Sequence, residues 1–292
     1  MQVSRVKVHV YVEGRELDSY VYGRIAETVI VGWFGFRVTR ADELRGNPSG
    51  GKNNLIRLFK SLRRRGKLVM DFKGQRSASI FFVDKDVDDK LRRLRRSPHL
   101  VYTSAYDLEG EVFRAGDLRD ALAAVLSISP NRVGMEFGMD DWRDVALVGW
   151  RPWAEYCLAA RSAGLQIANY KAPSQLHDGN CRAMDPVKSA SFFAAFSGAC
   201  QPLGLNPVDL LDKAKRSVAA DYRTTGGYGV FKGKWFSDVI RELAGASFPT
   251  ETGRAAAGFR QRLASAMAQT VDATATWSAR HRAALETAMT LV

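Results

Sequence analysis

The stretch that decides the fold is Ile80-Phe81-Phe82-Val83-Asp84-Lys85-Asp86-Val87-Asp88-Asp89, in which a short apolar run ends abruptly in carboxylates. A run of this kind, bounded by polar residues, is typical of a strand buried on both faces. Ligands of α/β sheets bind outside the carboxyl ends of such strands. The stretch therefore predicts a strand that delivers Asp84 and Asp86 to a binding site. The same acids would also suit the start of a helix, the role we expect for Asp88 and Asp89.

A second strand of this design lies near the start of the chain. Apolar residues alternate with polar ones from Val6 to Val12, and Glu13-Gly14 follows directly. If this strand neighbours the one before Asp84, the two carboxyl ends meet at one edge of the sheet. Mg²⁺ prefers oxygen ligands and can be held by one or two carboxylates together with substrate phosphates. Glu13, Asp84 and Asp86 are therefore candidate metal ligands, with solvent-exposed caps as the alternative.

The elements around these strands alternate between strand and helix. We expect helices over 16–31, 52–65 and 86–95, and further strands over 34–39, 67–72 and 100–103. This alternation predicts an α/β domain over 1–125, with a mainly parallel sheet and flanking helices. The remainder, 126–292, has helical periodicity and predicts a mostly α-helical C-terminal domain. From Asp117 onward the expected helices cover 117–126, 142–163, 186–200, 207–220, 234–244, 255–269 and 279–291.

The charge balance points to an anionic partner. The 292 residues carry 43 Lys and Arg against 31 Asp and Glu, a formal net charge of +12. Nucleic acid is the commonest partner of such a chain. Candidate contacts to it come from two arginine clusters and from a glycine-rich loop: Arg63, Arg64, Arg65, Arg92, Arg93, Lys232 and Lys234. For the arginine clusters a solvated helix end is the alternative, and for the neighbouring Trp235 and Phe236 it is core packing.

Lys52 is a candidate phosphate-binding residue. It follows Gly50-Gly51 and opens an expected helix, where loop amides, the helix N-terminus and an ammonium group together suit an anion. An exposed lysine at a helix start is the alternative. The Gly-x-x-x-x-Gly-Lys-Ser/Thr pattern of a nucleotide-binding P-loop is missing, so ATP hydrolysis by this chain is not expected.

Cysteine usage and hydropathy bear on the compartment. Cys157, Cys181 and Cys200 match no zinc pattern, and their odd number argues against a disulfide framework. No apolar stretch approaches the ~20 residues that span a bilayer, and the N-terminus lacks a signal-peptide pattern. We therefore expect a cytoplasmic protein with reduced thiols and no membrane partner.

Four pieces of sequence, in order, resemble one family. They are Val12-Glu13-Gly14, Gly50-Gly51-Lys52-Asn53-Asn54, Phe82-Val83-Asp84-Lys85-Asp86 and Tyr106-Asp107-Leu108-Glu109. Together they resemble the TOPRIM domain of topoisomerases, primases and OLD-type nucleases. The closer likeness is to the TOPRIM-like family that supplies the nuclease subunit of PARIS-type phage-defence modules. The likeness covers residues 6–115, with an echo at Phe231-Lys232-Gly233-Lys234.

The sequence departs from the family pattern at two places. Asp18 lies one position later than the family's aspartate, and Glu109-Gly110 stands where the family has Glu-Asn, with Glu111 close by. Whether Glu109 or Glu111 lies at the site stays open at this point.

The resemblance implies phosphodiester cleavage dependent on Mg²⁺ or Mn²⁺, with RNA (tRNA included) or DNA as substrate. Glu13, Lys52, Asp84 and Asp86 would be the catalytic residues, and Glu109 a further metal ligand. It also implies a homodimeric toxic effector of abortive anti-phage defence, controlled by an ATPase partner. A non-catalytic TOPRIM-like subunit that binds nucleic acid or a partner protein is the main alternative. A topoisomerase or primase fragment ranks below both, because those enzymes need residues on further domains.

Overall fold

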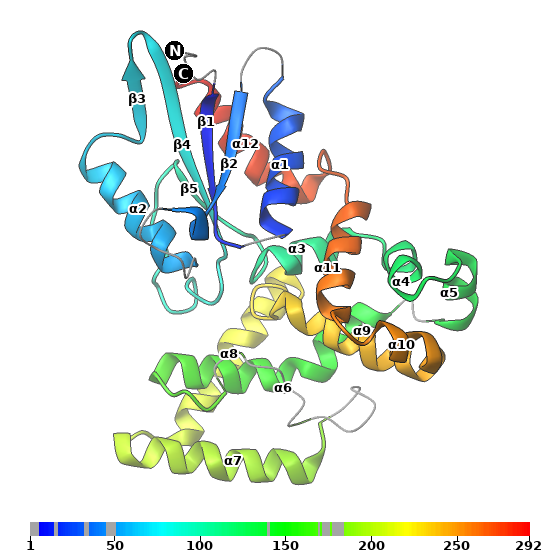
Figure 1. Cartoon of the computed structure of the whole chain (residues 1–292). Helices are drawn as coiled ribbons and strands as arrows, with labels where there is room; N and C mark the ends of the chain where they lie inside the picture. Colours follow the sequence, from blue (N-terminus) through cyan, green and yellow to red (C-terminus); the bar gives the residue numbers. More distant parts are fainter. Residues whose placement is uncertain are drawn as a thin grey trace. The chain divides into compact units, whose positions relative to one another are not determined.

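The computed structural model describes residues 6–14, 17–31, 35–44, 51–138, 141–168, 170, 176 and 184–292 (Figure 1). Over these residues the protein is α/β, with one mixed five-stranded sheet. It divides into two compact units. The first comprises Met1–Lys85, Leu94–Thr103 and Val271–Val292, and the second Asp86–Arg93 and Ser104–Thr270. This division does not coincide with the boundary expected near residue 125, because the second unit already includes Asp86–Arg93 and continues from Ser104, and the residues from Val271 onward belong to the first unit.

The sheet of the first unit is built around β1 (Val6–Val12) and β4 (Gln75–Val83), which are parallel neighbours. On the other side of β1 lies β2 (Gly35–Arg40), also parallel. The free edge of β4 is shared by β3 (Val69–Phe72), antiparallel to its first half, and β5 (Leu100–Tyr102), parallel to its second half. Three of these four pairings are parallel, so the expected mainly parallel character is present alongside one antiparallel strand.

Adjacent side chains of β4 pack on opposite faces of the sheet, because successive residues of a strand point to opposite sides. Phe82 stacks on Tyr22 of α1 (Leu17–Val29), with ring centroids 4.4 Å apart, and both rings meet His281 of α12 (Ala279–Met289) edge-on. Phe81 instead meets Phe59 of α2 (Lys52–Arg64). The sheet thus has α1 and α12 on one face and α2 on the other. A helix from the far end of the sequence completes the first unit.

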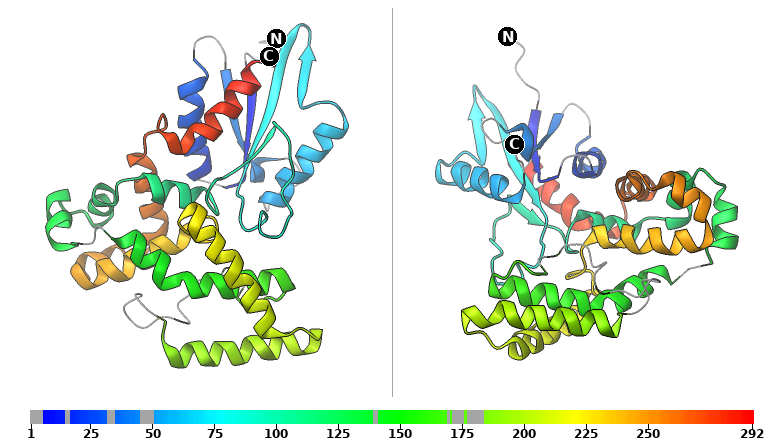
Figure 2. Two further views of the ribbon diagram at one scale, coloured as in Figure 1. Left: turned by 180° about the vertical axis from the view of Figure 1, so that it is seen from behind. Right: turned by 60° about the horizontal axis from the view of Figure 1, so that its bottom comes forward.

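The described part of the second unit is helical and contains no strand of the sheet. Its helices are α3 (Leu108–Ala115), α4 (Leu118–Leu126), α5 (Pro130–Glu136), α6 (Trp142–Ala163), α7 (Pro186–Cys200), α8 (Pro207–Thr225), α9 (Gly233–Ser247), α10 (Pro249–Ala255) and α11 (Phe259–Thr270). Helices α6 and α8 pack against each other (Figure 2). The core is aromatic: Trp150, Phe231, Trp235 and Phe236 are buried, with Phe231 and Phe236 rings 4.5 Å apart. Trp235 and Phe236 are thus core residues.

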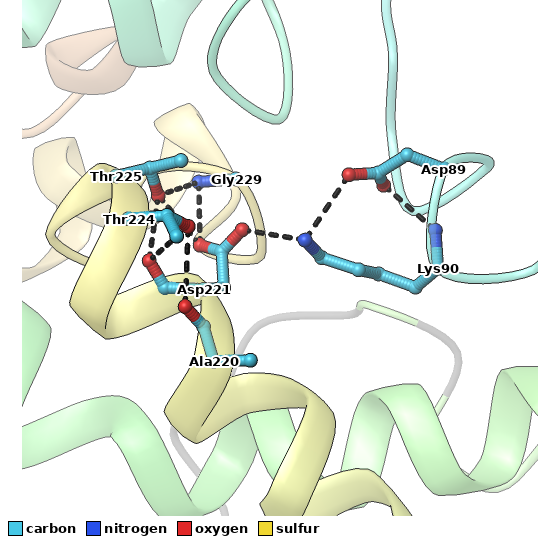
Figure 3. A network of polar contacts seen from close by, with 7 residues as sticks. All are labelled: Asp89, Lys90, Ala220, Asp221, Thr224, Thr225 and Gly229. Carbon is cyan, nitrogen blue, oxygen red and sulfur yellow. Dashed lines mark hydrogen bonds and ion pairs between the residues drawn. The ribbon is translucent and has the colours of Figure 1, made fainter.

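The expected helix over 86–95 does not form. Asp86–Arg92 is a run of turns, in which Asp86 and Arg92 have φ angles of 52° and 56° that a right-handed helix excludes. Long-range bonds hold the turns instead: the Asp86 N–H donates to the Tyr106 carbonyl, and the Lys90 ammonium lies 2.7 Å from the Asp221 carboxylate (Figure 3). The role expected for Asp88 and Asp89, to open a helix, is therefore wrong.

Two further helix predictions differ from the structure. The expected helix over 255–269 starts later, as α11 at Phe259, and a separate helix, α10, ends at Ala255 before Gly258 with a φ of 72°. Helices α3 and α5 lie in segments where no helix was expected. Both are short, at 8 and 7 residues, so each gives too few turns for a clear periodic signal.

Candidate functional site

Glu13 and Asp84 are brought together at the carboxyl ends of two adjacent strands. Val12 is in register with Phe82, so the residues that follow β1 and β4 leave the sheet at the same edge. The Asp84 N–H donates to Oε2 of Glu13 over 3.4 Å. Both side chains are partly exposed. The carboxylate of Glu13 therefore meets the backbone of Asp84 at a partly exposed edge of the sheet, although the two residues come from strands that are distant in sequence.

The turn that carries Glu13 is held by Asp18. The Gly14 N–H donates to the Asp18 carboxylate over 2.7 Å, and Asp18 is buried. A Cβ atom at position 14 would collide with that carboxylate, which explains the glycine directly after Glu13. Asp18 thus positions the turn, whatever its relation to the family's aspartate.

Lys52 lies beside the backbone that follows Asp84. It is the first residue of α2, after Gly51 with a φ of 87°, whereas Gly50 falls outside the described residues. Its Nζ donates to the Lys85 carbonyl over 3.3 Å and lies 5.9 Å from the centre of the Tyr102 ring. The structure therefore places Glu13, Lys52 and Asp84 around the end of β4.

Lys85 is a residue of this region that the sequence did not single out. It is buried, and its N–H donates to the Thr103 hydroxyl over 2.9 Å. A lysine between two aspartates normally indicates an exposed charged turn. The burial of Lys85 could therefore not be predicted from the local sequence.

The second unit contains the remaining acidic candidates, Asp86 and Glu109, together with Asp107, which sequence reasoning missed. Oδ1 of Asp107 accepts the N–H groups of Gly110 (2.8 Å) and Gly233 (3.0 Å), so one carboxylate caps the N-termini of α3 and α9. Burial raises the pKa of Asp107 well above its usual value, and the charges of Glu109 and Asp86 raise it further. The signal available in the sequence was an aspartate directly before an apolar segment, a capping pattern.

Glu109 and Glu111 have different surroundings. Glu111 is buried, and its Oε1 accepts the Ser104 hydroxyl over 2.8 Å. Glu109 keeps partial exposure and lies 3.8 Å from the Lys234 ammonium. Glu111 is thus engaged in holding the start of the 104–111 segment, and Glu109 is the more accessible of the two.

The candidate nucleic-acid contacts fall into two groups. Those at the surface are Arg63, Arg64, Arg65, Arg92, Arg93 and Lys234. Lys232 is half-buried, and its Nζ donates to the Tyr170 carbonyl over 3.2 Å. An internal bond of this kind orients Lys232 into the fold, so it is less suited to phosphate contact than the exposed arginines.

The donor set fits a hard divalent cation in part. Among the described residues, no three His, Cys, Asp or Glu side chains form a group able to hold a metal. Glu13 and Asp84 supply two carboxylates, and Mg²⁺ keeps several waters and completes its shell with substrate phosphates. The pair therefore suits a metal that is shared with a phosphate-bearing substrate.

In the described part of the chain, each helix is either too short or too polar to cross a lipid bilayer.

No protein-family model matches the sequence, and no curated protein matches it.

Proposed function

We propose that this protein is a TOPRIM-type nuclease that hydrolyses phosphodiester bonds with Mg²⁺ or Mn²⁺. The observation that carries the proposal is the contact between the Asp84 N–H and Glu13 Oε2 at the ends of adjacent parallel strands. A glutamate and an aspartate in these positions are what the resemblance to TOPRIM domains requires. The sheet with helices on both faces is compatible with such a domain.

The residues have distinct roles in this proposal. Glu13 and Asp84 would hold the metal, which when bound activates water and stabilises charge on the leaving oxygen. The Lys52 ammonium, held beside the Lys85 carbonyl, would orient a substrate phosphate. Asp86, two residues after Asp84, and Glu109 are further candidate ligands from the resemblance alone. The proposal depends only on Glu13, Lys52 and Asp84.

The substrate and the biological setting extend the proposal. A net charge of +12 supports a nucleic-acid substrate, RNA (tRNA included) or DNA. The likeness to nuclease subunits of phage-defence modules supports a toxic effector in the cytoplasm that acts as a homodimer under an ATPase partner. The helical part after residue 125 would then bind the partner or the nucleic acid.

Isosteric substitutions provide the test. Purified protein with Mg²⁺ is incubated with labelled RNA and DNA, beside Glu13→Gln, Asp84→Asn and a control, Glu27→Gln. Glu27 is exposed on α1, so its charge change leaves the Glu13–Asp84 pair intact. We expect cleavage by the wild type and the control only, with a loss of at least about 10²-fold in both site variants. Cleavage that persists in Glu13→Gln protein contradicts the proposal.

A non-catalytic nucleic-acid-binding subunit is the second candidate. Exposed Arg63, Arg64 and Arg65 at the end of α2 favour it, because such a cluster binds phosphates without chemistry. In that case Glu13→Gln protein keeps its biological effect, whereas charge reversal at these arginines abolishes it.

A further inference from the structure

A pocket of about 520 Å³ lies entirely within the second unit. One wall is the turn segment that ends at Arg93, and the others come from α6 and α8. Its apolar lining includes Leu158 and Ala214, both buried. The volume falls within the 300–1,000 Å³ typical of small-ligand sites.

The lining of this pocket is cationic. Lys90, Arg92, Arg93 and Lys213 all contribute to it, and none of the described lining residues is acidic. Lys90 is neutralised, since it pairs with Asp89 and Asp221 at 3.1 and 2.7 Å. Arg92, Arg93 and Lys213 are exposed, and no carboxylate in the described part of the chain forms an ion pair with them. Three positively charged side chains around one cavity, with no carboxylate among its described lining residues, attract an anion.

The turn segment that carries Lys90, Arg92 and Arg93 is held in place through the ion pair between Lys90 and Asp221 (Figure 3). Asp221, buried, accepts the Gly229 N–H (3.0 Å) and the Thr225 hydroxyl (2.7 Å) in addition to its pair with Lys90. At the start of the segment, Asp86 donates to the Tyr106 carbonyl over 2.6 Å. A segment fixed at two points presents its side chains without a large ordering cost on binding.

These features select the ligand chemistry. Guanidinium groups bind phosphate through paired hydrogen bonds, and Arg92 and Arg93 bring two of them to the rim. The Ser217 hydroxyl lines the same pocket and can add a neutral donor, whereas the Ser162 hydroxyl already donates to the Ala159 carbonyl over 2.8 Å. Leu158 and Ala214 offer an apolar surface to a sugar or base.

We propose that this pocket binds the phosphate of a nucleotide unit, held by Arg92, Arg93 and Lys213. The proposal rests on the function proposed above only in taking a nucleic acid as the source of that phosphate. A free nucleotide presents the same chemistry, and the experiment distinguishes the two sources.

The test measures binding in EDTA, so that no cleavage occurs. Fluorescence anisotropy of labelled single-stranded RNA and DNA compares the wild type with Arg93→Glu and with two α8 variants, Lys213→Glu and Arg216→Glu. Both α8 residues are exposed, three positions apart, but only Lys213 lines the pocket. We expect Lys213→Glu and Arg93→Glu each to weaken binding about tenfold at 100 mM salt and to reduce the salt slope by about one. Arg216→Glu should change affinity little.

A second experiment identifies the source of the phosphate. It uses calorimetry to measure the binding of AMP to the wild type and to the same variants. If AMP binds the wild type and not Lys213→Glu protein, while oligonucleotide affinity is the same in both, the ligand is a free nucleotide. If Lys213→Glu weakens oligonucleotide binding alone, it is a nucleic-acid strand. If Lys213→Glu and Arg216→Glu behave alike towards both ligands, the pocket assignment is overturned. Thermal melting of each variant confirms folding. Because no arm depends on cleavage, an inactive Mg²⁺ assay would count against the nuclease and leave this result standing.

Discussion

The Asp84 N–H lies 3.4 Å from Oε2 of Glu13, although the two residues are 71 positions apart in the chain. The contact exists because β1 and β4 are parallel neighbours and end together. A carboxylate is stabilised by a nearby hydrogen-bond donor or cation. The backbone N–H of Asp84 is such a donor to Glu13 within the protein.

The first prediction concerns the turn beside Glu13. Gly14→Ala places a Cβ against the Asp18 carboxylate and should destabilise the protein by about 1–3 kcal/mol, the usual cost of overpacking. Urea unfolding measures it. Asp18→Ala removes the colliding atoms, so the double variant should lose less stability than the sum of the two single variants. Strict additivity would show that the two positions do not touch.

The second prediction concerns Lys52. Removal of the ammonium in Lys52→Met should lower Mg²⁺-dependent cleavage about 10²-fold, as for the loss of one preorganised donor. Lys60→Met is the matched control, because Lys60 is exposed on the same helix, α2. Equal cleavage by the two variants would remove Lys52 from the site.

The third prediction concerns the buried pair Lys90–Asp221. Lys90→Met leaves the Asp221 carboxylate, which has no exposed side-chain surface, without its cation. We expect a loss of about 2–3 kcal/mol in urea unfolding, below the full value for a buried pair because Lys90 is partly exposed.

Two companion variants make that measurement specific. Adding Asp221→Asn to Lys90→Met removes the buried carboxylate that has lost its cation. The double variant should therefore recover part of the lost free energy of unfolding. Lys215→Met breaks the exposed pair with Asp212 and should cost less than about 1 kcal/mol. A similar cost for Lys90→Met and Lys215→Met would show that Asp221 is solvated.

The fourth prediction is a pH dependence. The pKa of Asp107 is raised in the folded protein by burial and by neighbouring negative charges, so the folded state binds its proton more tightly than the unfolded state does. Stability from this group is therefore fully present below its unfolded pKa near 3.8 and is lost as pH rises through the folded value. Asp107→Asn keeps the oxygen that Gly110 and Gly233 bond and cannot ionise.

The melting temperature of Asp107→Asn, relative to the wild type, should accordingly rise between pH 4 and pH 8. Asp117→Asn serves as the comparison, because Asp117 caps α4 in the same way but is exposed. Its difference from the wild type should not follow that trend. Parallel curves for both variants would argue against a raised pKa at Asp107.

Local sequence patterns anticipated the parts of the fold that depend on one element at a time. The period of two in Val6–Val12 and the apolar run before Asp84 predicted β1 and the end of β4. Helix α6 has the predicted bounds, Trp142–Ala163, because its apolar residues keep a helical period over six turns and Gly164 ends it. The proximity of Glu13 and Asp84 was expected only if these two strands are neighbours, a condition that the structure meets.

The features that escaped prediction depend on contacts between distant segments. The 86–92 turns are held by Tyr106 and Asp221, which no window of local sequence includes. Asp107 gains its second helix cap only because Gly233 lies close to Gly110, too close for any side chain at position 233. The return of α12 to the sheet is likewise invisible in its own sequence, since its partners Tyr22 and Phe82 lie more than 190 positions away.

The packing of α12 on the sheet means that the second unit is, in topological terms, an insertion within the first. A chain that lacks α12 would expose Tyr22 and Phe82 and lose the packing of the first unit, although α12 begins 266 positions after Glu13. During synthesis, the sheet cannot reach its final packing until α12 has left the ribosome. Activity that depends on Glu13 and Asp84 would therefore be withheld from incomplete chains.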